Sequence, residues 1–432
     1  MESDLTSYLN IIFYILAWIV TLMVYQLKKK HFDAGSLILT SLLIYSIASL
    51  YLYDSPYYRF NQIHIFPFIY MYLMFMIALY PILKYNNNKI KEIQKPNIIL
   101  LNTVSIIFII SCFAQVPTII SNFSNSIANL LFNDSGGMEL YEDAMSNSYG
   151  TGAGITNLPA IISGAFSNVG VFLFFYYLTL KKSNKLILIG LLISCLAILL
   201  AYIVLGQRGL IMEIIFSMII TYFALKKFFQ PKIKKTIKII GVFLLIAVSI
   251  PTIALTNSRF ANTIGGSESS VYFYAGQANL YFNNYGLDNG GIRYGDRTFP
   301  LFKRMLGIDN VPKNFWERRQ KHNNLKINDN VFVSFVGDFT LDYGPFTATL
   351  MFIVFTLIVI KMTKTRNQRI KFHQLILLHF VMCVCFLGGL KSFTFSDVGG
   401  NLQIIVYLIM FFIFWFNYDY SRMLQRKTKS YT

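Results

Sequence analysis

The stretch "YIVLGQRGLIMEIIF", residues 202–216, joins two long apolar runs through only four residues, Gly206 to Gly209. A run of about 20 apolar residues is long enough to cross a bilayer as a helix, which satisfies its own backbone hydrogen bonds in lipid. The stretch therefore predicts two membrane-spanning helices joined by a tight turn. It also places Arg208 at that turn, where a permanent charge is costly unless it is paired or hydrated.

The same alternation of apolar runs and polar connections extends along all 432 residues. Hydrophobic residues make up 55% of the chain and charged residues 13%, whereas about a quarter of the residues in soluble domains are charged. The runs are continuous, which favours helices over alternating strands. We predict an all-α polytopic membrane protein, a single transmembrane domain over 1–432 with about eleven helices (10–12), near 8–27, 35–53, 63–83, 98–120, 158–180, 186–205, 210–225, 236–256, 346–360, 372–390 and 398–417.

Basic residues separate the connections between these spans into two sets. One set holds nearly all of the lysines outside the long connections, in 28–30, 84–95, 181–185, 226–238, 361–371 and the C-terminal tail. The alternate set, apart from the long connection 257–345, holds only Arg59, Arg208 and Lys391. Because lysine and arginine accumulate in cytoplasmic loops, the first set is predicted to be cytoplasmic. The N-terminus and both long connections, 121–157 and 257–345, are then external, and the C-terminus is cytoplasmic.

This distribution accounts for the net charge of +18, so the sequence does not call for a nucleic-acid partner. The four cysteines lie inside apolar runs, and no histidine or acid stands near them at metal-ligand spacing. We therefore expect no metal and no cofactor.

Arg208 has two interpretations of about equal weight. Its side chain could reach up to lipid headgroups, or its planar guanidinium could clamp an anion in a cavity open to the outside. The connection 257–345 adds further arginines, several of them in "GGIRYGDRTFPLFKRMLG", residues 290–307. These form either a solvated basic face or a site for a phosphate-bearing lipid headgroup, and the candidates are Arg259, Arg293, Arg297 and Arg304.

The same connection contains candidates for sugar binding and for proton transfer. Tyrosines alternate with amide side chains at its start, which suits a sugar but also suits a helix lying in the headgroup region; they are Tyr272, Tyr274, Tyr281 and Tyr285. His322 is the one histidine of the connection. Asp338 and Asp342 are four residues apart and would share a face of a helix, either as functional acids or as capping residues.

At this point the chain resembles the bacterial O-antigen polymerase family, the Wzy-type oligosaccharide repeat unit polymerases. The resemblance rests on "GQRGLIME" at 206–213, on the large external connection before the last three spans, and on the acidic connection 121–157. It rests also on "NVFVSFVGDFTLDYG" at 330–344, which is similar to the family pattern Asn-Val-Tyr-Thr followed by Asp-Phe-Gly.

The resemblance implies a GT-C-like bundle in the bacterial inner membrane, with a cavity that opens outward, and a metal-independent glycosyltransferase. A growing glycan would pass from undecaprenyl pyrophosphate to the non-reducing end of a lipid-linked repeat unit, and a chain-length regulator in the same membrane would be a partner. Arg208 matches the family's arginine and, with the other arginines, would compensate the charge of the pyrophosphate. His322 and Asp342, followed by Asp338 and Glu268, are the candidates for a general base.

Two alternatives to a polymerase stay open. An O-antigen ligase shares this architecture and transfers the glycan to lipid A-core; related ligases use a histidine in the corresponding external loop, and polymerases often lack it. A flippase for lipid-linked oligosaccharides belongs to another class and would carry charges deep in many helices. The spans of this chain are nearly free of charge.

Overall fold

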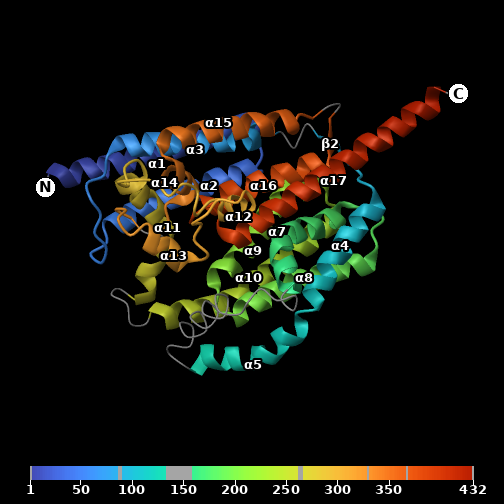
Figure 1. Cartoon of the computed structure of the whole chain (residues 1–432), viewed down its shortest axis with the longest axis horizontal. Helices are drawn as coiled ribbons and strands as arrows, with labels where there is room; N and C mark the ends of the chain where they lie inside the picture. Colours follow the sequence, from blue (N-terminus) through green and yellow to red (C-terminus); the bar gives the residue numbers. More distant parts are fainter. Residues whose placement is uncertain are drawn as a thin grey trace.

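The computed structural model describes residues 2–85, 90–132, 158–260, 266–327, 330–365 and 368–430. These residues form a bundle of long helices, shown in Figure 1. The helices are α1 (Glu2–Lys29), α2 (Ala34–Tyr53), α3 (Ile65–Lys84), α4 (Ile98–Phe113), α5 (Val116–Phe132), α7 (Leu158–Thr179), α8 (Lys185–Val204), α9 (Arg208–Leu225), α10 (Pro231–Phe260), α11 (Gly266–Tyr281), α12 (Pro300–Met305), α13 (Phe315–Lys321), α14 (Ser334–Tyr343), α15 (Pro345–Met362), α16 (Phe372–Gly388) and α17 (Asp397–Ser430).

Ten helical segments of the described chain are long and apolar enough to cross a membrane. The fold is therefore the one expected of a multi-pass membrane protein. The eleventh predicted span, 372–390, corresponds to α16, which has only 17 residues. Nearly every side chain of α16 is buried by neighbouring helices. A helix enclosed by protein on all sides is not required to match the thickness of the lipid, which explains its shorter length.

The prediction of a purely α-helical chain needs one small correction. The three-residue strands β1 (Glu92–Gln94) and β2 (Arg369–Lys371) pair in parallel, with Ile93 opposite Ile370. Both strands belong to lysine-rich connections, which therefore lie side by side. Sequence reasoning missed this pair because three residues are too few to show an alternating pattern.

The lysine-rich connections meet at one end of the bundle, which we call the lysine-rich end. The Lys29 ammonium donates to the carbonyl of Tyr85 at 2.8 Å, and the Lys227 ammonium donates to the carbonyl of Ile90 at 2.6 Å. Lys226 likewise donates to the carbonyl of Phe32. These contacts agree with the sequence-based grouping of connections into two sets.

The 257–345 segment lies at the opposite end, which we call the site end. Its residues contact the connection between α2 and α3: the Asn283 amide accepts from the N–H of His64 at 2.9 Å and donates to its carbonyl at 2.7 Å. Much of the segment is helical, from α11 to α14. Of the other long connection, residues 121–132 belong to α5, and the acidic residues expected there, Asp134, Glu139, Glu142 and Asp143, lie outside the described residues.

Helix α11 packs directly on the membrane-spanning helix α2. A Cβ atom at Gly276 would lie 2.6 Å from the carbonyl oxygen of Ala48, so only glycine permits this approach of the two backbones. The Ser49 hydroxyl donates to the carbonyl of Gly276 at 3.0 Å and accepts from the Asn279 amide at 2.8 Å. The first helix of the 257–345 segment is therefore anchored in the bundle, and it positions the residues that follow.

Candidate functional site

Two arginines and two aspartates of the 257–345 segment form one buried group, which we call the acid–arginine cluster: Arg293, Arg297, Asp338 and Asp342. Arg293 Nε lies 2.6 Å from Asp342 and its Nη2 lies 3.3 Å from Asp338. Arg297 Nε lies 3.2 Å from Asp338. The two aspartates are one helical turn apart on α14, as their spacing predicts, and both are completely buried.

Backbone N–H groups and a threonine hydroxyl also bind the two carboxylates. Asp342 accepts from the N–H and the hydroxyl of Thr298, each at 2.8 Å, and Asp338 accepts from the N–H of Phe393 at 2.7 Å. The Arg297 guanidinium donates to the Ser392 hydroxyl at 2.7 Å. The cluster thus ties three segments together: residues 293–298, α14 and the connection from α16 to α17.

The cluster balances two positive charges with two negative charges away from water. Burial raises the pKa of Asp338, while the charges of Arg297 and Arg293 act in the opposite direction. Losing one member of such a group leaves a buried charge without its counterion, which is strongly destabilising. Asp338 and Asp342, which the sequence offered as general bases, are therefore placed where they hold the segment together.

A second group surrounds Asp296, whose carboxylate is buried between three cationic or basic side chains. His322 Nε2 lies 3.0 Å from one carboxylate oxygen, and the Lys321 ammonium lies 2.7 Å from the same oxygen. The Lys303 ammonium pairs with the other oxygen. Burial would raise the pKa of Asp296, but the hydrogen bonds from Lys303, Lys321 and His322 outweigh it and lower that pKa below the usual value.

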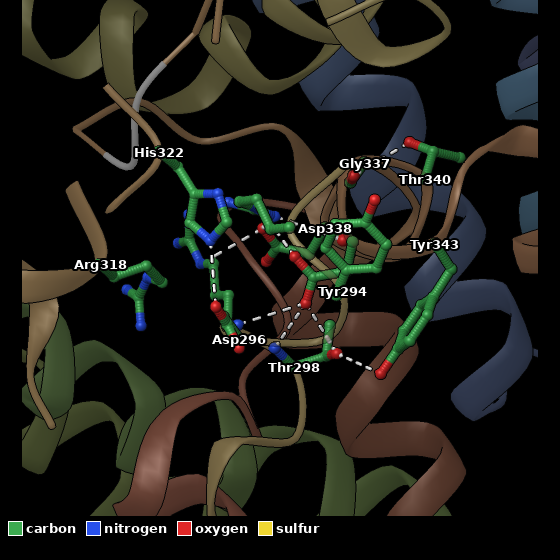
Figure 2. A network of polar contacts seen from close by, with 12 residues as sticks. Tyr294, Asp296, Thr298, Arg318, His322, Gly337, Asp338, Thr340 and Tyr343 are labelled. Carbon is green, nitrogen blue, oxygen red and sulfur yellow. Dashed lines mark hydrogen bonds and ion pairs between the residues drawn. The ribbon is translucent and has the colours of Figure 1, made fainter. Parts of the chain in front are cut away.

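Figure 2 shows His322 directly above Asp296, with Asp338 beside them. Because the Asp296 carboxylate is ionised, it can only accept, so Nε2 of His322 must be the nitrogen that carries a proton. Nδ1 is then the basic nitrogen of the ring. The His322 side chain is 12% exposed, in contrast to the fully buried carboxylates of α14. A histidine oriented by a carboxylate in this way is suited to general-base catalysis.

Arg208 lies at the start of α9, also at the site end. Its Nη1 donates to the Thr256 hydroxyl on α10 at 3.2 Å, and its guanidinium carbon lies 4.6 Å from the ring centre of Tyr274 on α11. These contacts hold the guanidinium between three helices and fix its plane. Arg208 therefore reaches into the protein at the junction of α9, α10 and α11.

A further ion pair connects α9 with the acid–arginine cluster. The Lys391 ammonium lies 2.9 Å from the Glu213 carboxylate of α9, and its carbonyl accepts from the N–H of Ser334 at 2.7 Å. The neighbouring Ser392 binds Arg297. The helix that carries Arg208 is thus linked to the cluster through residues 391–393.

The tyrosines predicted to bind sugar are found in three settings on α11 and just after it. Tyr272 is 50% exposed and lies near Tyr51. Tyr274 lies under Arg208. Tyr281 and Tyr285 stack on each other with ring centres 6.5 Å apart. The amides that alternate with them bind other protein groups; the Gln277 side chain, for example, accepts from the N–H of Phe332 at 3.1 Å.

One predicted residue is directed away from these groups, and two have side chains that the structure does not describe. Arg304 is directed to the backbone carbonyl of Pro312, at 2.5 Å, rather than to the acid–arginine cluster. The side chains of Arg259 and Glu268 lie outside the described residues. Among the general-base candidates whose side chains are described, His322 is the one that reaches solvent.

The sequence reasoning did not identify Asp296, Ser392 or Lys391 as site residues. Asp296 had a local signal, because an acid between two arginines in "RYGDR" is a natural counterion. The backbone geometry of the structure also marks the site. Tyr294, Ser334 and Asp397 all adopt positive φ angles, which are costly for residues other than glycine. Each of the three is next to a residue of the site or contacts one.

Comparison of the chain with protein-family models, with curated proteins and with solved structures finds no match. The class of protein therefore follows from the fold and the site alone. It is a multi-pass helical membrane protein with a histidine–aspartate pair and a buried acid–arginine cluster at one end of its bundle.

Proposed function

We propose that the chain is a membrane glycosyltransferase that polymerises lipid-linked O-antigen repeat units. In this proposal the site end faces outward from the bacterial inner membrane, and both substrates are glycans on undecaprenyl pyrophosphate. A chain-length regulator in the same membrane is the proposed partner. The observation that carries the glycosyltransferase chemistry is the His322–Asp296 pair, which stands among cationic side chains at the end of a membrane bundle, and the choice of a polymerase follows from the sequence resemblance.

The proposed reaction is a single displacement. A hydroxyl of the acceptor's non-reducing sugar attacks the anomeric carbon of the donor, and the bond from that carbon to the pyrophosphate oxygen breaks with inversion. Nδ1 of His322 takes the hydroxyl proton, and Asp296 stabilises the imidazolium that forms. The leaving pyrophosphate keeps its negative charge, which Arg208 and the cations around Asp296 compensate. The reaction scheme contains no metal.

His322 also favours a second candidate function, the O-antigen ligase, because a histidine in the corresponding segment is typical of related ligases. A ligase would use the same donor and the same proton transfer, with lipid A-core as the acceptor. The two functions differ in the surface glycan that remains when the gene is deleted.

The test is a deletion strain complemented with the wild-type chain, His322→Ala or Asn323→Ala, with surface lipopolysaccharide separated as a ladder on a gel. A polymerase predicts core plus one repeat in the deletion strain, a full ladder with wild type and Asn323→Ala, and no ladder with His322→Ala at equal protein level. Asn323 is the matched control because it is the exposed neighbour of His322.

Deletion that leaves no repeat on the surface would exclude the polymerase and leave the ligase or the flippase. A full ladder from His322→Ala would exclude this histidine as the base and would remove the observation that carries the proposal.

A further inference from the structure

A cavity of about 420 Å³ lies between α14, α15, α16 and α17, and we call it the α15–α17 groove. Its size is within the range of small-molecule sites, but its lining is almost entirely apolar. Tyr407 is a lining residue with a polar group, and its hydroxyl is bonded to Nδ1 of His379 at 2.9 Å. The groove is therefore built for a hydrocarbon ligand.

The groove follows helices that are apolar enough to cross a membrane. On α15 its lining begins at Met351 and ends at Met362, the last residue of that helix. From Met351 to Met362 the helix rises by about 16 Å, roughly half of the hydrocarbon thickness of a bilayer. The groove thus extends along the depth at which lipid tails lie.

The groove is open at the side, between α15 and α17. Ile358 on α15 and Leu408 on α17 line it and are 49% and 44% exposed. The α16 side is closed, since Val381 and Cys385 are 1% exposed. A lipid tail could enter from the surrounding membrane through this side opening without crossing water.

Three phenylalanines line the groove at the site end: Phe299, Phe339 and Phe393. Their rings contact one another, with centres 5.1–6.0 Å apart. Phe339 directly follows Asp338, and the N–H of Phe393 donates to the carboxylate of Asp338 at 2.7 Å. The apolar groove and the charged site are therefore adjacent, with only this aromatic layer between them.

We propose that the α15–α17 groove binds the polyisoprenoid tail of a lipid pyrophosphate. The proposal rests on the proposed function, which requires a lipid-borne substrate whose headgroup reaches the site end. A tail in the groove would bring its charged headgroup to the residues just beyond the aromatic layer, where Arg293, Arg297 and Lys303 pair with aspartates. Because the tail moves from lipid into an apolar groove, its binding depends on van der Waals packing in the groove rather than on removal of apolar area from water.

The test uses purified protein and native mass spectrometry, with undecaprenyl phosphate as the probe and palmitoyl-oleoyl-phosphatidylglycerol as the competitor. Ile358→Trp and Leu408→Trp fill the groove from its open side. Leu357→Trp and Ile409→Trp are matched controls, because these adjacent residues are also exposed but do not line the groove.

We expect the wild-type chain to retain the probe against excess phosphatidylglycerol. Each groove variant should weaken binding about tenfold or more, and each control by less than about twofold, because only the groove variants displace tail carbons from van der Waals contact with the groove. Equal weakening in all four variants, or none in the groove variants, would place the tail elsewhere. Displacement of the probe by phosphatidylglycerol would make the groove an ordinary phospholipid site.

Binding is measured without turnover, so it separates this inference from the proposed function. Retention of the probe by a wild-type chain that produces no glycan ladder would overturn the polymerase and leave the groove in place. A normal ladder from both groove variants, together with unchanged binding, would overturn the groove assignment alone.

Discussion

Arg208 and Arg293 both belong to the set of arginines that the sequence offered for phosphate binding, yet their surroundings differ. Arg293 is buried between two aspartates, whose negative charges already balance the acid–arginine cluster. Arg208 lies outside that cluster, against the Thr256 hydroxyl and the Tyr274 ring. Its proposed role at the pyrophosphate can therefore be tested without disturbing the acid–arginine cluster.

We expect Arg208→Ala to lower polymer formation at least about 100-fold, in the range found when a preorganised electrostatic partner is removed. Arg208→Lys should restore little activity, since an ammonium lacks the planar fork of the guanidinium. The measurement is the surface glycan ladder at equal protein level. Arg59→Ala, which removes an exposed arginine at the same end of the bundle, should leave the ladder unchanged. A full ladder from Arg208→Ala would show that this arginine is not needed to bind the pyrophosphate.

Asp296→Asn is predicted to destabilise the folded chain at pH 7 by about 2 kcal/mol, because hydrogen bonds from charged groups to the carboxylate are weakened. The pKa of Asp296 is lowered in the folded state. Its contribution to stability is therefore complete above the unfolded pKa of about 3.9 and is lost as the pH falls toward the lower folded value.

The measurement is thermal unfolding in detergent for wild type and Asp296→Asn at several pH values. The difference between the two proteins should be constant near neutral pH and should shrink below about pH 4. A difference that grows on acidification would contradict the assigned ion pairs.

Helix α11 belongs to the long 257–345 connection, yet it packs closely against a membrane-spanning helix. It packs on α2 through Gly276, and its polar side chains bind backbone and hydroxyl groups of neighbouring elements. Tyr274 on the same helix lies against Arg208. The position of Arg208 relative to the rest of the site therefore depends on the packing of α11 against α2.

Gly276→Ala should destabilise the protein by about 1–3 kcal/mol, because the added methyl group would overlap the carbonyl of Ala48. Gly241→Ala on α10 is the control, since a Cβ there has no atom within 4 Å and alanine favours a helix. Thermal unfolding in detergent measures both. If the two variants unfold at the same temperature, the close packing of α11 on α2 is wrong.

The whole molecule has two chemically different ends. Lysine-rich connections meet at one end, and the acid–arginine cluster, the His322–Asp296 pair and Arg208 lie at the other. The two ends are the polar boundaries of a bundle whose helices are otherwise apolar. By the excess of lysine and arginine, the lysine-rich end is predicted to face the cytoplasm.

Single cysteines test this orientation in intact cells. Asn310→Cys, at the site end, should react with a membrane-impermeant maleimide, and Lys30→Cys, at the lysine-rich end, should react only after the membrane is permeabilised. The native cysteines, Cys112, Cys195, Cys383 and Cys385, are all buried, so the background should be low. The reverse pattern of labelling would place the site in the cytoplasm and would exclude the proposed external reaction.

The sequence by itself determined the membrane-spanning helices, their two sets of connections and the shared face of Asp338 and Asp342. These features depend on local properties: the length of an apolar run, the number of lysines in a connection, and the spacing of residues on one helix. Each of these features can be recognised in a short stretch of sequence, because the free energy of transferring a helix into lipid depends mostly on the residues of that helix. Helix α16 is shorter than a lipid-exposed span needs to be, because other helices cover it.

Only the tertiary structure decided what each charged residue does. The pairing of Asp296 with His322, the link from Ser392 to Arg297 and the α15–α17 groove all join residues far apart in the chain. In the sequence, Asp342 was as plausible a base as His322, and Asp338 followed them. The aspartates and His322 differ in burial and in their nearest counterion. Both properties depend on which distant segments of the chain meet, because the free energy of a charge is set by the groups that replace its water.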